Sequence, residues 1–154
     1  MKKILLFYII FLAILMSDST SAQNCKTYHA KNCKFNEKDE FQYSGQSRSA
    51  AFTIGQSSEF PLLAYGGYDY SVTLCYEKKL GDVQLKVMEE DGRKVIYDNA
   101  DDSYSKRKIF TVSSTKKLIV QITVVGEKEG ERNEKNTGCV GVLIEYMKTP
   151  NSGF

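Results

Sequence analysis

The chain carries few of the side chains on which enzyme catalysis depends. His29 is the only histidine, so a serine or cysteine nucleophile would have little choice of general base. We interpret His29 as a surface histidine beside a disulfide. The carboxylates of residues 89–91 and 126–138 fall in segments typical of solvated turns, which lack the burial that a general acid needs. The sequence therefore predicts a protein that is not an enzyme.

One acidic segment has the composition of a metal site. Oxygen ligands are concentrated between two expected strands, at Asp98, Asn99, Asp101 and Asp102. Carboxylate and amide oxygens are the ligands that Ca²⁺ takes in proteins. The segment lacks the spacing and the glycine of an EF-hand, so an ordinary acidic turn is the alternative. Apart from calcium at this segment, no cofactor is expected.

Tyrosine supplies much of the aromatic surface that could contact a ligand. The chain has 10 tyrosines, 8 phenylalanines and no tryptophan, and tyrosine rings on a sheet could stack on sugars or peptides. The candidates are Tyr65, Tyr68, Tyr70 and Tyr76. The same residues could equally belong to a core. The small polar segment 44–49 could line a ligand groove or merely turn a hairpin, and we expect the turn unless a pocket forms there.

Cysteine usage indicates an oxidising compartment. All four cysteines follow the first 22 residues, at Cys25, Cys33, Cys75 and Cys139. An even number in a short exported chain is typical of two disulfides. We expect Cys25 to pair with Cys33 across a turned segment, and Cys75 with Cys139, which would tie an early strand to the last one. A four-thiolate zinc site is disfavoured because no CxxC pair is present.

The first 22 residues have the features of a secretory signal peptide. Lys2 and Lys3 precede an apolar run over residues 4–16, and small residues end the segment at Ala22. The run has 13 residues, whereas a helix needs roughly 20 to cross a bilayer. We therefore expect cleavage after Ala22, no membrane anchor afterwards, and a secreted or periplasmic product.

Beyond residue 41, apolar and polar residues alternate in short runs, which predicts strands and not amphipathic helices. The run 117–125 is apolar on both faces and should be a central strand. The run 68–77 presents one aromatic face and places Cys75 on the other. Further strands are expected at 50–54, 83–87, 94–97, 108–112 and 139–147. The segment 90–92 should turn a hairpin between two of them.

These strands predict an all-β fold, a single antiparallel β-sandwich or jelly-roll-like domain over residues 41–148. Residues 23–40 form a polar segment, either a short helix or a loop pinned by a disulfide. Residues 126–138 are almost wholly glycine and polar or charged residues, which predicts a mobile hairpin loop. Residues 149–154 should form a C-terminal tail.

The turn and strand residues also carry a family resemblance. It rests on Gly67-Tyr68-Asp69-Tyr70, Leu74-Cys75, Leu80-Gly81-Asp82, Leu85-Lys86-Val87, Tyr97-Asp98-Asn99, Phe110-Thr111-Val112 and Gly138-Cys139-Val140-Gly141-Val142. The chain resembles small exported bacterial proteins of unassigned function, and its plan is similar to GOLD and pre-peptidase C-terminal domains. The resemblance implies a β-sandwich that acts in cargo contact, secretion or substrate attachment without catalytic residues.

Charge excludes one class of partner. The 21 basic and 19 acidic residues are interspersed and give a net charge of +2, which provides no basic field for nucleic acid.

Export and the missing catalytic set predict a non-catalytic binding or envelope-associated module for a protein or glycan. The alternative is a periplasmic inhibitor of a hydrolase such as a lysozyme or protease, which would offer the loop 126–138 to a catalytic cleft. The sequence leaves the oligomeric state open.

Overall fold

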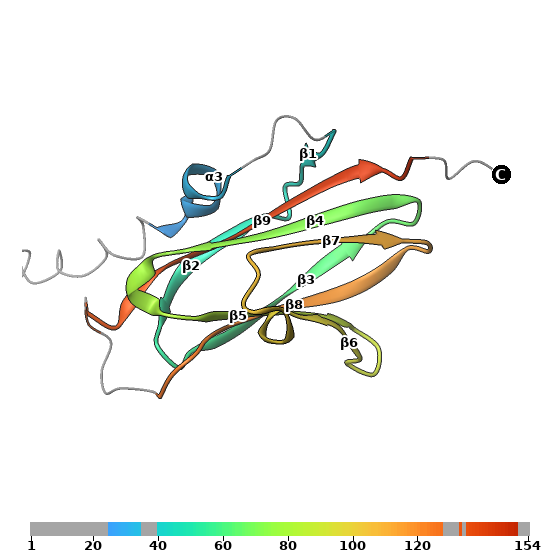
Figure 1. Cartoon of the computed structure of the whole chain (residues 1–154). Helices are drawn as coiled ribbons and strands as arrows, with labels where there is room; N and C mark the ends of the chain where they lie inside the picture. The colour runs from blue at the N-terminus through green and yellow to red at the C-terminus, as the bar shows by residue number, and fades with distance from the viewer. Residues whose placement is uncertain (1–24, 35–39, 128–132, 134, 151–154) are drawn as a thin grey trace, which may run out of the picture.

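The computed structural model describes residues 25–34, 40–127, 133 and 135–150. The elements in chain order are α3 (Tyr28–Asn32), β1 (Gln42–Tyr43), β2 (Arg48–Thr53), β3 (Ser57–Ala64), β4 (Tyr68–Tyr76), η1 (Lys78–Leu80), β5 (Val83–Glu89), β6 (Val95–Asp98), η2 (Asn99–Asp102), β7 (Arg107–Val112), β8 (Lys116–Val124) and β9 (Thr137–Lys148). They build two antiparallel sheets that pack face to face (Figure 1). The predicted antiparallel β-sandwich is confirmed.

One sheet has the order β1-β9-β4-β7, with β2 also paired to β9, and the other has the order β3-β8-β5-β6. β8 lies between β3 and β5, as its two apolar faces predicted. Every strand expected from the alternation is present, and β5 and β6 form the expected hairpin. The prediction missed β1 and β3. β3 contains Pro61, which is tolerated because β3 is an edge strand.

The core lies between the two sheets and is built from the inward-facing residues of their central strands. β8 contributes Leu118, Val120, Ile122 and Val124, all of which are almost fully buried. Opposite them lie the alternate residues of β4 and β9, including Tyr70, Val72, Leu74, Val140, Val142 and Ile144. Burial of this many aliphatic side chains supplies the main driving force for folding.

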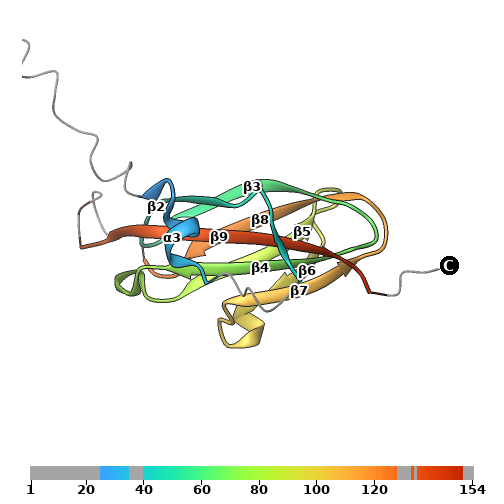
Figure 2. The same cartoon turned by 90° about the horizontal axis from the view of Figure 1, so that it is seen from above.

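The N-terminal segment forms the short helix α3, which lies on the outer face of the larger sheet over β9 (Figure 2). Disulfides join Cys25 to Cys139 and Cys33 to Cys75. The expected pairing of Cys25 with Cys33 and Cys75 with Cys139 is therefore wrong. Cys75 and Cys139 stand on neighbouring strands, β4 and β9, and each receives a cysteine from one flank of the helix.

Gly141 explains how α3 comes so close to the sheet. A Cβ atom at this position would lie 2.8 Å from the Cα atom of His29 and 3.0 Å from the Sγ atom of Cys75. Only glycine leaves room for the helix backbone at that distance. Residues 25–33 are thus bound to the domain at both ends and along the helix.

Several predicted segments lie outside the described residues. These are the expected signal peptide over residues 1–22, residues 23–24 and 35–39 of the expected polar segment, residues 128–132 and 134 of the expected loop, and the last four residues of the tail. Across the ranges that the structure describes, no helix is long and apolar enough to cross a membrane.

Candidate functional site

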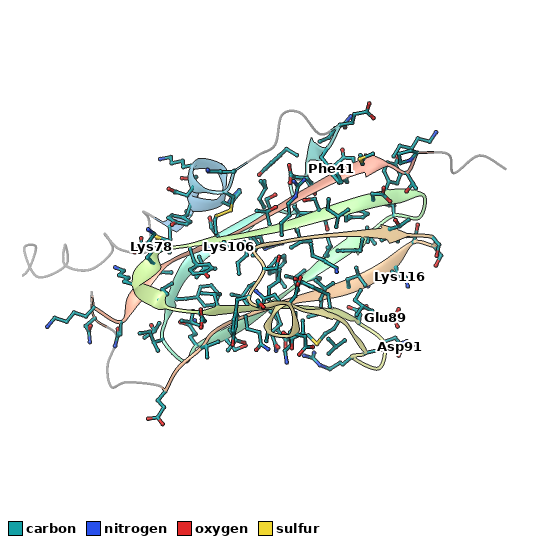
Figure 3. The ribbon with its side chains drawn as sticks, in the orientation of Figure 1. Phe41, Lys78, Glu89, Asp91, Lys106 and Lys116 are labelled. Carbon is teal, nitrogen blue, oxygen red and sulfur yellow. A yellow bond between two sulfur atoms is a disulfide. The ribbon has the colours of Figure 1, made fainter. Side chains whose placement is uncertain are left out.

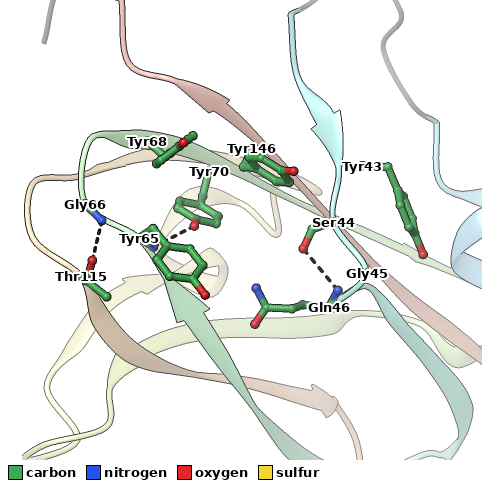
Figure 4. Close-up of a pocket in the computed structure, with 10 residues that line it drawn as sticks. All are labelled: Tyr43, Ser44, Gly45, Gln46, Tyr65, Gly66, Tyr68, Tyr70, Thr115 and Tyr146. Carbon is green, nitrogen blue, oxygen red and sulfur yellow. Dashed lines mark hydrogen bonds between the residues drawn. The ribbon is translucent and has the colours of Figure 1, made fainter.

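A pocket of about 590 Å³ opens beside the β3–β4 loop and the β7–β8 turn (Figure 4). We call it the tyrosine pocket. It is lined by Tyr43, Ser44, Gly45, Gln46, Tyr65, Gly66, Tyr68, Tyr70, Thr115 and Tyr146. Half of these residues are tyrosines, and they come from segments far apart in the sequence.

The pocket forms where the chain twice crosses between the two sheets. The β3–β4 loop and the β7–β8 turn both make this crossing at the same end of the sandwich. Gly66 allows the two connections to touch, because a Cβ atom there would lie 2.9 Å from the carbonyl oxygen of Ser113. The Gly66 N–H also donates to Thr115 Oγ1 at 3.1 Å. The mouth of the pocket is therefore held by contacts between loops.

The inner wall of the tyrosine pocket is rigid. Tyr70 is only 2% exposed, and its hydroxyl oxygen accepts a hydrogen bond from the Tyr65 N–H at 2.8 Å. Its ring stacks on Phe110 with centroids 6.1 Å apart and lies 6.4 Å from the Tyr146 ring. Tyr68 meets Tyr146 edge to face at 5.9 Å. Burial raises the pKa of the Tyr70 hydroxyl, which keeps it protonated in neutral solution.

Two tyrosines at the rim are about half exposed. Tyr65 is 52% exposed and Tyr43 is 49% exposed. Their side chains belong to the β3–β4 loop and to β1, which approach the pocket from opposite sides (Figure 4). The Tyr43 ring stacks on the His29 ring with centroids 6.3 Å apart. The rim therefore offers mainly the Tyr65 ring to a ligand, above a floor that is already packed.

The turn between β1 and β2 completes the pocket and is fixed by its own polar groups. Ser44 Oγ accepts from the Gln46 N–H at 3.2 Å, and Ser47 Oγ donates to the Ser44 carbonyl at 2.7 Å. The Gln46 side-chain amide accepts from the Leu63 N–H at 2.8 Å and donates to the Leu63 carbonyl at 3.0 Å. Within the segment 44–49, residues 44–46 therefore both turn the chain and line the pocket.

Three of the four candidate tyrosines, Tyr65, Tyr68 and Tyr70, meet in this pocket. Tyr76 does not, because it lies at the other end of β4 with Lys106 Nζ 4.8 Å from its ring centroid. Sequence reasoning did not select Tyr43, Thr115 or Tyr146 for the site. Their local patterns carry no signal for it, since the β7–β8 crossing places Thr115 there and the pairing of β1 with β9 places Tyr43 and Tyr146.

The acidic segment at η2 is organised by protein hydrogen bonds. Asn99 is fully buried; its side-chain oxygen accepts from the Leu85 N–H at 2.7 Å and its nitrogen donates to the Val83 carbonyl at 3.1 Å. Asp98 accepts from Gln84 and pairs with Lys86, and Asp102 accepts from the Tyr97 hydroxyl. In the part of the chain that is described, no three His, Cys, Asp or Glu side chains gather into a group able to hold a metal ion. These contacts account for η2 as a structural turn, and calcium binding stays a prediction.

The second group of carboxylates lies on the β5–β6 hairpin. Glu89 pairs with Lys116 at 3.0 Å and Glu90 with Lys117 at 3.8 Å. Figure 3 shows Glu89 and Asp91 near Lys116 at the surface of the molecule. Ion pairs in this solvated position fit the interpretation of these residues as a charged turn.

His29 is buried, so the expectation of a surface histidine is wrong. It is 8% exposed because α3 presses it toward β2 and Tyr43. Its Nδ1 lies 2.8 Å from Ser49 Oγ and its Nε2 lies 3.2 Å from the Tyr43 hydroxyl. The Ser49 hydroxyl donates to the Lys26 carbonyl at 3.0 Å, which leaves its oxygen to accept from Nδ1. In this network His29 does not act as a base toward Ser49.

Burial lowers the pKa of His29 below its usual value of 6.5. As pH falls below that value, the unfolded chain takes up a proton before the folded chain does. We therefore expect the free energy of unfolding to decrease as pH falls from about 8 to about 5.5. Urea unfolding at the two pH values should show this decrease, and it should be smaller in His29→Gln. An equal decrease in both proteins would contradict the assignment to His29.

Comparisons with known proteins do not assign the chain to a family. No family model matches the sequence, and no curated protein matches it. Among solved structures, PliG from Aeromonas hydrophila, a periplasmic lysozyme inhibitor of g-type lysozyme, is 12% identical with a TM-score of 0.47, covering 74% of this chain and 92% of that one. A mutant PliG from Escherichia coli is 12% identical with a TM-score of 0.41, covering 75% and 96%. The tyrosine pocket must be interpreted from its own geometry.

Proposed function

We propose that this chain is an exported, non-catalytic binding module that holds a glycan in the tyrosine pocket. One observation carries the proposal, namely a pocket with a packed tyrosine floor and the exposed Tyr65 ring at its rim. Aromatic rings of this kind present flat apolar faces with a hydroxyl at one edge. A sugar ring has the matching character, with C–H faces and hydroxyl groups around its edge.

The pocket also has the rigidity that tight binding favours. The hydrogen bonds of Tyr70 and Gln46 and the contact at Gly66 hold its walls before a ligand arrives. A preformed site loses less conformational entropy on binding than one that must be ordered. Serine, threonine and tyrosine hydroxyls around the cavity can exchange hydrogen bonds with sugar hydroxyls.

The disulfides support the exported location. All four cysteines are paired, and among the described residues none is free. Disulfides of this kind persist in oxidising compartments such as the periplasm or the extracellular space. A secreted or periplasmic module is therefore consistent with the chemistry of the chain.

Replacing Tyr65 tests the proposal directly. We expect Tyr65→Ala to weaken binding of a soluble oligosaccharide about tenfold, because loss of one aromatic contact costs about 1 to 1.5 kcal/mol. Tyr65→Phe keeps the ring and should bind almost as tightly as the wild type. Calorimetric titration against cello-, chito- and uronate oligosaccharides measures both effects.

Ile96→Ala serves as the control, because Ile96 is also exposed but lies on β6 outside the pocket. Binding that is unchanged in Tyr65→Ala would refute a role for the pocket. Lysozyme and protease assays run on the same samples address the alternative. Inhibition of a hydrolase that persists in Tyr65→Ala would replace glycan binding with the inhibitor function.

A further inference from the structure

A second groove, of about 450 Å³, runs along the side of the sandwich where the edges of β2 and β3 face each other. We call it the side groove. Its floor is formed by core side chains of both sheets, among them Phe52, Ile122 and Val140. Its rim carries Lys26 and Arg48 on one side and Ser58 and Glu59 on the other.

The side groove is a neighbour of the tyrosine pocket along the chain. Residues 44–46 line the pocket, and the next three residues, 47–49, line the groove. His29 in the groove is hydrogen-bonded to Tyr43 in the pocket at 3.2 Å. Successive residues of an extended chain lie about 3.3 Å apart, so the two linings are close enough for one oligosaccharide to span. One polymeric ligand can therefore contact both surfaces.

The rim of the side groove is positively charged. Lys26 and Arg48 are both exposed, and within the described ranges neither forms an ion pair. Glu59 is the one acidic residue that lines the groove, and it is already bound by Arg93 and Gln121. The Arg48 guanidinium lies 5.6 Å above the Phe60 ring, which holds it across the opening. The groove thus presents two cations to a ligand and no uncommitted carboxylate.

The backbone of β3 disfavours an extended peptide as the occupant. A peptide strand would need the N–H and C=O groups on the free edge of β3. The Gln46 amide already binds both groups of Leu63. Pro61, two residues earlier, faces the same way and has no N–H to offer. A glycan needs none of these groups.

We propose that the glycan bound by this protein is acidic, with one sugar in the tyrosine pocket and the carboxylate of a neighbouring sugar beside Arg48 and Lys26 in the side groove. This inference rests on the proposed function and names the class of its ligand. Guanidinium and ammonium groups bind carboxylates through charge-assisted hydrogen bonds. The tyrosine rings stack on the sugar in the pocket, and the two cations select a glycan that carries a carboxylate.

The test compares each acidic oligosaccharide with its own methyl ester, which has the same backbone and no charge. Oligogalacturonate, alginate and hyaluronan fragments are titrated at low salt into the full oxidised protein. We expect the acid to bind about tenfold more tightly than the ester, since two exposed ion pairs contribute modestly. The preference should shrink as salt is raised.

The variant Arg48→Gln/Lys26→Gln should bind acid and ester equally well. Lys94→Gln removes an exposed charge from the β5–β6 hairpin and should keep the preference. Lys26→Gln alone should keep part of the preference, and circular dichroism verifies that each variant is folded. These variants separate the two cations of the groove from a general effect of net charge.

Three results would overturn the inference. Equal binding of acid and ester by the wild type would leave a neutral glycan as the ligand and the proposed function intact. The second result is that no acidic oligosaccharide binds, whereas a neutral one binds and is weakened by Tyr65→Ala. This result would also leave a neutral glycan as the ligand and the proposed function intact. Tighter binding of poly-glutamate than of every glycan, unaffected by Tyr65→Ala, would refute both proposals in favour of an acidic protein ligand.

Discussion

Replacing Cys25 and Cys139 together with alanine is expected to lower the free energy of unfolding by about 4 to 5 kcal/mol. The bond joins residues separated by 114 positions, and closing so long a loop removes much of the entropy of the unfolded chain. The loss is a large fraction of the stability of a domain this size. Urea unfolding of the oxidised proteins measures it.

The second disulfide provides a matched comparison. Cys33 and Cys75 are separated by 42 positions, so their replacement should cost slightly less, about 4 kcal/mol. Peptide mapping of the wild type under non-reducing conditions should recover Cys25 linked to Cys139. Recovery of a peptide with Cys25 linked to Cys33 would contradict the structure and the ranking of the two variants.

Gly141→Val is expected to destabilise the domain by about 3 kcal/mol. The new side chain would meet the backbone of His29 and the Sγ atom of Cys75, and neither can move aside easily. The helix is fixed at both flanks by disulfides, and Cys75 is itself bonded to Cys33. Thermal and urea unfolding should both report the loss.

Combining this substitution with loss of a disulfide shows where the strain arises. In a protein that lacks Cys25 and Cys139, one flank of α3 is released, so the helix can shift away from the introduced valine side chain. The cost of Gly141→Val should then fall well below its cost in the wild type, and the difference is the coupling energy of a double-mutant cycle. Identical costs in both backgrounds would show that the clash lies elsewhere.

The strands could be predicted from the sequence because their alternation follows directly from burial on one face. β8 and β4 show this most clearly, with Val120 and Val72 pointing into the core. β3 was missed because Pro61 interrupts a run that an edge strand tolerates. The disulfide pairing failed for a different reason. Alternation places Cys75 on the outer face, but it does not say that a helix from the start of the chain covers that face.

The candidate site could be predicted only in part. The tyrosine-rich strand indicated Tyr68 and Tyr70, and the small polar segment around Ser44 was compatible with either a turn or a groove. The pocket itself depends on a crossing between sheets, which places Thr115, and on the pairing of β9 with β4, which places Tyr146 opposite Tyr70. Sheet order is a long-range property of the fold, and a local pattern does not encode it.

The disulfide connections also constrain how the molecule is made. In a chain that leaves a translocation pore N-terminus first, Cys25 and Cys33 emerge together, long before Cys139. Their closeness favours an early bond between them, which must later be broken by thiol–disulfide exchange. If the chain is exported as proposed, its maturation would depend on an isomerase, or on oxidation slow enough for β9 to arrive first. A cell that lacks isomerase activity would then accumulate the chain with Cys25 bonded to Cys33 and with the outer face of the sheet uncovered.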